Sequence, residues 1–136
     1  MEIGGETMKY LKAFVAGIVI PATILQIATL IEFFIGWPPI KQSYFFHQLP
    51  IVWAVWNVVY VAYGNRIWPA NKVLAYLLHG AVLGVILLIP ALFFAIPKIL
   101  GFTGEAQYIP IGLVPIAYAL IWAFGVRPLN RVFGIE

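Results

Sequence analysis

Residues 73–97 read VLAYLLHGAVLGVILLIPALFFAIP, a stretch without a single Asp, Glu, Lys or Arg. A bilayer core about 30 Å thick is crossed by roughly 20 helical residues, because each residue adds about 1.5 Å to a helix. The stretch therefore predicts a helix that crosses a membrane. Three further apolar stretches surround it, and we expect membrane helices over residues 13–36, 45–64 and 109–126 as well.

The composition of the whole chain agrees with a membrane setting. Hydrophobic residues make up 63% of the 136 residues and charged residues only 10%, whereas soluble domains carry about 25% charged residues. The four expected helices leave no room for a separate soluble domain. We therefore interpret residues 1–136 as one integral membrane domain with an all-α fold.

Two phrases of the sequence occur twice. AYGNR at residues 62–66 is echoed by AFGVR at residues 123–127, and PANKV at residues 69–73 is echoed by PLNRV at residues 128–132. The first copy of each phrase lies at or just after the end of the second apolar stretch, and the second copy lies at or just after the end of the fourth. The pattern predicts two tandem helical hairpins of the same orientation, which is a parallel internal repeat.

The repeated phrases also predict where the helices end. Glycine readily takes the left-handed conformation that closes a helix, so we expect Gly64 and Gly125 to be C-terminal caps. Asn71 is expected to cap the start of the third helix. Residues 130–133 then read as the beginning of a fifth helix at the end of the sequence.

The cations predict the orientation of the chain. If both termini are cytoplasmic, six of the eight Lys and Arg residues lie on that side, and cytoplasmic loops of membrane proteins carry such an excess. We therefore expect a multi-pass protein of the cell membrane with both ends in the cytoplasm. The six are Lys9, Lys12, Arg66, Lys72, Arg127 and Arg131, and the other two are Lys41 and Lys98.

Polar residues at membrane depth are the candidate functional residues, because they are costly in lipid. They are Gln26, Glu32, Asn57 and His79. His79 has two interpretations: a neutral imidazole that holds helices together, or a proton-relay or ligand residue. Glu32 lies near the outer boundary, where it reaches water or a cation, or forms a substrate or proton site.

Helical rise places some of these residues at a common depth. His79 and Asn57 lie about 10 Å from the inner end of their helices, and Tyr118 and Thr23 come to a similar level. We expect these four side chains to form one polar layer between the helices. On the third helix, Gly80 and Gly84 form a small-residue face, which permits close packing within the chain or between copies of it.

Several kinds of chemistry have no support in the sequence. The chain has no Cys and no Asp, and its two His residues are expected too far apart for one haem. We find no metal-binding cluster, nucleotide-binding loop, catalytic triad or clustered basic face for nucleic acid. We therefore predict no catalytic residue and no cofactor.

Two function classes remain open. The first is a non-enzymatic membrane component or subunit that packs against itself or a partner. The second is a small oligomeric transporter or channel whose path is lined by the four candidate polar residues. The expected partners are membrane lipids and either further copies of the chain or a larger membrane complex.

Overall fold

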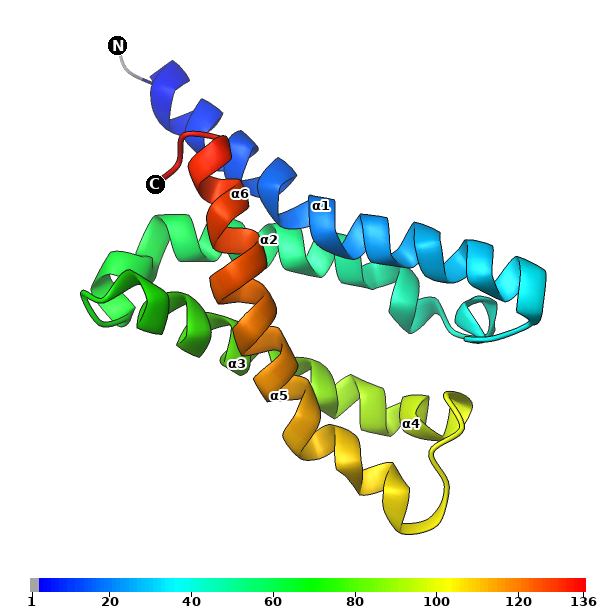
Figure 1. Ribbon diagram of the computed structural model, residues 1–136. Helices are drawn as coiled ribbons and strands as arrows, with labels where there is room; N and C mark the ends of the chain where they lie inside the picture. Colours follow the sequence, from blue (N-terminus) through cyan, green and yellow to red (C-terminus); the bar gives the residue numbers. More distant parts are fainter. Residues whose placement is uncertain (1–2) are drawn as a thin grey trace.

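The computed structural model describes residues 3–136, which form helices joined by short turns and contain no strand (Figure 1). The long elements are α1 (Ile3–Ile35), α2 (Tyr44–Ile67), α3 (Lys72–Phe93) and α5 (Ile109–Ile121). The last of these continues through the π-helical turn η3 (Trp122–Val126) into α6 (Arg127–Val132). The short elements are η1 (Ile40–Gln42), α4 (Ile96–Ile99) and η2 (Gly104–Tyr108).

Four helical segments within residues 3–136 are long and apolar enough to cross a membrane, which confirms the predicted number. They cover Gly4–Ile35, Tyr44–Ile67, Lys72–Phe93 and Gly104–Val132. The first and last run further than the sequence suggested. The third ends earlier, because Ala95 takes a left-handed conformation with φ of 53° and turns the chain into α4.

The four long segments pair as two helical hairpins. Helix α1 packs along α2, and α3 packs along α5. The hairpins converge near the two chain termini and spread apart at the opposite end (Figure 1). At the converging end, η3 and α6 reach across and contact α1.

Glycine allows the helices within each hairpin to approach closely. A Cβ atom added at Gly17 of α1 would lie 2.8 Å from the Cα of Ala54 in α2. One added at Gly84 of α3 would lie 2.8 Å from the Cα of Pro115 in α5, and one at Gly80 would overlap the Tyr118 carbonyl. Any larger residue at these positions would push the backbones apart.

The predicted glycine caps at Gly64 and Gly125 are wrong. Gly64 lies inside α2 and Gly125 inside η3, and neither has a positive φ. Gly125 instead gives room to α1, because a Cβ atom there would lie 2.6 Å from the Cδ1 of Ile20. The predicted cap at Asn71 is confirmed, since its side chain accepts a hydrogen bond of 3.1 Å from the backbone N–H of Leu74.

The expected start of a fifth helix at residues 130–133 is also wrong. A proline ring normally collides with the carbonyl four residues earlier and ends a regular helix. Here the helix widens just before Pro128, and the Arg127 N–H bonds to the Trp122 carbonyl five residues earlier. The helix therefore passes the proline, and it ends only before Gly134, which has a φ of 69°.

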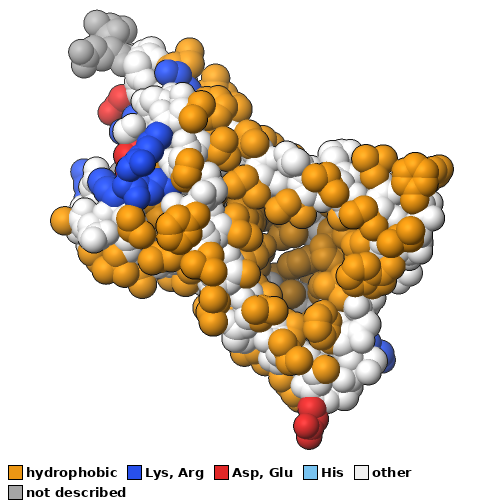
Figure 2. Space-filling model, viewed as in Figure 1, with side chains coloured by type: hydrophobic (Ala, Val, Ile, Leu, Met, Phe, Trp, Pro, Cys, Tyr) orange, Lys and Arg blue, Asp and Glu red, His pale blue; other side chains and the backbone are white. Residues whose placement is uncertain are grey.

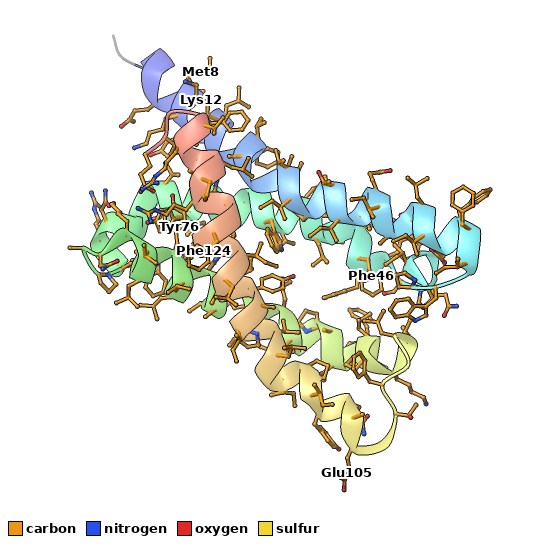
Figure 3. All side chains as sticks on the ribbon, viewed as in Figure 1. Met8, Lys12, Phe46, Tyr76, Glu105 and Phe124 are labelled. Carbon is orange, nitrogen blue, oxygen red and sulfur yellow. The ribbon has the colours of Figure 1, made fainter. Side chains whose placement is uncertain are left out.

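Two apolar clusters hold the hairpins together. The larger lies at the converging end and includes Trp53, Tyr76 and Trp122, all at most 3% exposed. The smaller joins Ile40 and Phe46 of the first hairpin to Ile96 of the second. Figure 3 shows Phe46 at the end where the hairpins spread apart. Phe45 and Leu49 of α2 pack against both clusters.

Candidate functional site

His79 lies 1% exposed on α3 and has a hydrogen-bond partner at both ring nitrogens. The Trp68 Nε1–H donates to His79 Nδ1 at 3.0 Å, and His79 Nε2 lies 2.9 Å from the Trp56 carbonyl oxygen. An indole N–H can only donate and a carbonyl can only accept. The arrangement therefore defines a neutral imidazole with its proton on Nε2.

Trp56 binds His79 a second time. Its Nε1–H donates to the His79 carbonyl at 3.0 Å, and its ring stacks on the imidazole with centroids 4.5 Å apart. Helices α2 and α3 are thereby joined by a reciprocal pair of hydrogen bonds, each from a side chain to a backbone carbonyl. This arrangement stabilises the contact between the two hairpins, next to the packing of Tyr60 on Tyr76.

Asn57 and Asn130 form a second reciprocal pair, and both are fully buried. Asn57 Nδ2 donates to Asn130 Oδ1 at 2.7 Å, and Asn130 Nδ2 donates to Asn57 Oδ1 at 2.9 Å. Asn57 also donates to the Ala13 carbonyl at 2.7 Å, and Asn130 donates to the Tyr76 hydroxyl at 2.8 Å. This asparagine pair therefore connects α1, α2, α3 and α6.

The polar layer expected of four side chains does not form. Asn57 and His79 belong to the two separate networks just described. Thr23 donates to the Val19 carbonyl of its own helix at 2.6 Å. The Tyr118 ring packs against Trp53, with centroids 5.0 Å apart.

Gln26 and Glu32 lie apart from both networks, on the part of α1 that follows Pro21. Gln26 is exposed. Glu32 Oε2 accepts a hydrogen bond of 3.1 Å from the backbone N–H of Lys41, which fastens the linker after α1 to its helix. The four candidate residues therefore do not converge on one site.

Asn130 was missed by sequence reasoning, because residues 130–133 were assigned to a separate helix. Its signal is the helical spacing of Ala123, Val126 and Asn130 in the sequence, all of which are buried. A continuous helix through Pro128 would have placed Asn130 beside the core. The sequence gives no sign of the wide turn that permits this continuity.

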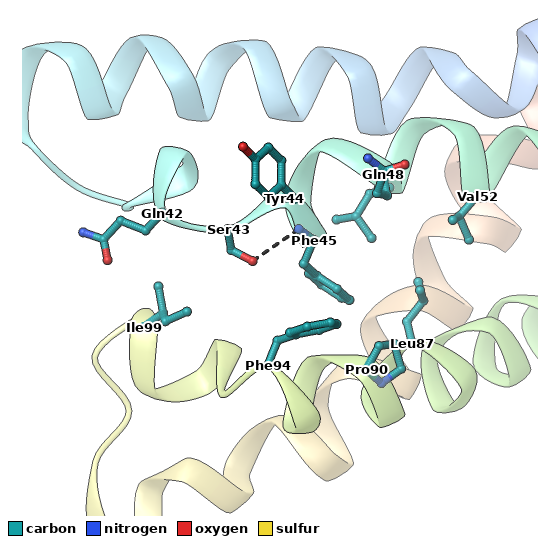
Figure 4. A pocket seen from close by; sticks show the side chains of 11 residues that line it. Gln42, Ser43, Tyr44, Phe45, Gln48, Val52, Leu87, Pro90, Phe94 and Ile99 are labelled. Carbon is teal, nitrogen blue, oxygen red and sulfur yellow. Dashed lines mark hydrogen bonds between the residues drawn. The ribbon is translucent and has the colours of Figure 1, made fainter.

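Next to the larger apolar cluster, the two hairpins enclose a cleft, which we call the interhairpin cleft. It is lined mainly by apolar side chains of α2 and α3 and has a volume of about 520 Å³ (Figure 4). Figure 2 shows the molecule hollowed between the hairpins, with hydrophobic side chains around the hollow. The lining residues are Gln42, Ser43, Tyr44, Phe45, Gln48, Leu49, Val52, Leu87, Pro90, Phe94 and Ile99.

Two smaller cavities, of about 220 and 250 Å³, also lie between the hairpins and share Leu49 with the cleft. Ligand pockets commonly measure about 300–1,000 Å³ and place a few polar groups among apolar walls. In the cleft, the polar residues Gln42, Ser43 and Gln48 come from η1 and the start of α2, and the remaining walls are apolar. The cleft can thus hold an apolar group such as a hydrocarbon chain.

No known protein family matches this chain, and neither a curated protein nor a solved structure matches it. The class of protein therefore follows from the fold and from these contacts. Four helices within residues 3–136 are long and apolar enough to cross a membrane, which is compatible with a small membrane protein. Its buried Asn and His side chains bind one another and the backbone.

Proposed function

We propose that this protein is a non-enzymatic component of a membrane, which packs against itself or against a partner subunit. One observation carries the proposal: the buried polar side chains Asn57, His79 and Asn130 use their hydrogen-bonding groups to hold helices together. Substrate paths need polar groups that face a cavity. The interhairpin cleft and the two smaller cavities beside it are instead bordered largely by apolar side chains.

The outer surface supports packing within a membrane. Large apolar side chains are exposed along the helices, among them Phe33, Phe34 and Phe93, which are 73%, 77% and 83% exposed. Lipid or another apolar helix must cover such side chains, because exposed apolar patches of this extent are avoided in water. Short connections between the helices leave the lateral faces open to a partner.

Two experiments separate this role from the alternative, a small oligomeric transporter or channel. The transporter predicts proton-coupled flux in proteoliposomes that is abolished by Glu32→Gln or His79→Ala while folding is retained. The role as a membrane component predicts that no flux occurs. It also predicts that a larger assembly co-purifies with the protein in mild detergent. Flux that depends on Glu32 would overturn the proposal.

We also propose that the two hairpins are a tandem repeat. The register that aligns the repeated phrases places Asn57 on Tyr118. In the first hairpin, a Cβ atom added at Gly17 would lie 2.9 Å from the Cβ of Asn57, and in the second, one at Gly80 would meet Tyr118. Corresponding glycines thus approach corresponding residues. Separately expressed halves, residues 1–68 and 69–136, should each insert with both ends on one side, and insertion with ends on opposite sides would contradict the repeat.

We also propose that the protein lies in the cell membrane with both termini facing the cytoplasm. The start of α1 and the C-terminus lie at the same end of the molecule (Figure 1), where the excess of Lys and Arg is found. The chain has no native Cys, so single cysteines can be labelled without background. In intact cells, an impermeant thiol reagent should label Lys98→Cys and spare Lys12→Cys. The reverse pattern would refute this orientation.

A further inference from the structure

A separate cavity of about 290 Å³ lies at the converging end of the two hairpins. It belongs to none of the networks predicted from the sequence, and it lies away from the interhairpin cleft. Its walls come from α1, α2, α3 and the residues after α6. Its polar lining residues are Lys9, Tyr60, Asn65, Lys72, Tyr76 and Glu136.

The Glu136 carboxylate occupies this cavity as an anion bound by several groups. Its Oε1 lies 3.0 Å from Arg127 Nε and 3.8 Å from Arg131 Nε, and its side chain is only 20% exposed. The Tyr76 side chain lines the same cavity. Lys9 and Lys72 line the same cavity, so the cations around it outnumber this carboxylate.

The floor of the cavity offers a hydroxyl donor to an anion. Tyr60 and Tyr76 are 8% and 1% exposed, and their rings are in contact at a tilt of 36°, with centroids 4.1 Å apart. The Tyr76 oxygen already accepts a hydrogen bond from Asn130 Nδ2 at 2.8 Å. Its own proton is therefore available to an acceptor in the cavity. Donation by Asn130 also polarises the Tyr76 hydroxyl, since hydrogen bonds in a chain strengthen one another.

We propose that this basic cavity binds a phosphate group and that the Glu136 carboxylate holds the place of that anion. Lys9 and Lys72 supply charge, and the Tyr76 hydroxyl supplies a directed hydrogen bond. Because the cavity lies at the ends of α2 and α3, where the membrane-spanning segments stop, both a lipid headgroup phosphate and a free phosphate can reach it. This inference goes beyond the proposed role as a membrane component and does not depend on it.

The test uses the full-length protein purified in a neutral detergent. Phosphatidylglycerol is titrated in mixed micelles with phosphatidylcholine in one arm, and inorganic phosphate is titrated in the other, with the melting temperature as the readout. Each basic residue near a membrane surface contributes enough to alter the affinity for an anionic lipid about fivefold. Lys9→Gln and Lys72→Gln should each weaken binding by about that factor, and Glu136→Gln should strengthen it about fivefold.

Lys98→Gln is the matched control, because it removes the same charge at the other hairpin end, in α4, and should leave binding unchanged. A Lys9- and Lys72-dependent response to phosphatidylglycerol alone identifies a lipid headgroup, and one to inorganic phosphate identifies a free anion. The melting temperature of Tyr76→Phe without anion, compared with that of the wild type, shows how far this substitution changes folding. Its effect on anion binding can then be measured separately. Equal affinities in Lys72→Gln and Lys98→Gln, or no response to either anion, would overturn the proposal.

Discussion

The asparagine pair makes a quantitative prediction about stability. Asn57→Leu removes three hydrogen bonds and leaves the carbonyl oxygen of the buried Asn130 side chain without its partner. Asn130→Leu does the same to Asn57 and also removes the donor to Tyr76. An unsatisfied buried polar group costs about 1–3 kcal/mol, so each single substitution should lower the free energy of unfolding by about that amount.

The double substitution removes both partners and leaves neither asparagine unpaired. Its loss of stability should therefore be smaller than the sum of the two single losses. Hydrogen bonds between membrane helices show coupling energies of about 0.6–1.7 kcal/mol, and we expect a value in this range. The coupling energy can be measured by a double-mutant cycle with reversible denaturation in mixed micelles.

Gln26→Leu is the control for this cycle, because Gln26 is exposed on α1 and its loss should change stability by less than about 0.5 kcal/mol. Strict additivity of Asn57→Leu and Asn130→Leu would refute the reasoning. So would single substitutions as mild as the control. Either result would mean that the two side chains do not bind each other in the folded protein.

Three further predictions address packing and the cleft. Gly80→Ala should destabilise the protein by about 1–3 kcal/mol in detergent unfolding, because its Cβ would overlap α5, whereas Gly112→Ala, in open space, should not. Trp68→Phe should lower stability by about 1 kcal/mol, since His79 Nδ1 loses its donor, and a wild-type melting curve would argue against the tautomer of His79 that carries its proton on Nε2. Leu49→Trp should fill the interhairpin cleft and reduce the lipid that co-purifies with the protein, as measured by native mass spectrometry, and unchanged lipid content would argue against an accessible cleft.

The membrane helices were predictable because their signal is compositional. A run of apolar residues as long as the bilayer is thick favours a helix whatever its neighbours are. The cap at Asn71 was predictable for a related reason, since a side chain that bonds a backbone N–H three residues later is a local interaction. Local and compositional features therefore transfer directly from sequence to structure.

The partners of the buried polar residues were not predictable. Depth along a helix places Asn57 and His79 at one level, but it does not give the rotation of each helix about its axis. That rotation directs Asn57 toward α1 and α6, whereas the imidazole of His79 faces the indoles of Trp56 and Trp68. Only packing of the complete chain determines these directions.

The wide turn at Trp122–Val126 has a consequence for the direction in which the following side chains point. Each residue of a regular helix advances about 100° around the axis. The turn holds one residue more than a regular turn does. Compared with a regular helix over the same residues, the segment beyond the turn is therefore rotated by about that angle. Closing the turn into a regular helix with the same residues would swing Asn130 out of register with Asn57, whereas deleting one residue from the turn would restore a regular helix and keep that register. The wide turn therefore sets the direction in which the side chains of α6 face the first three long helices.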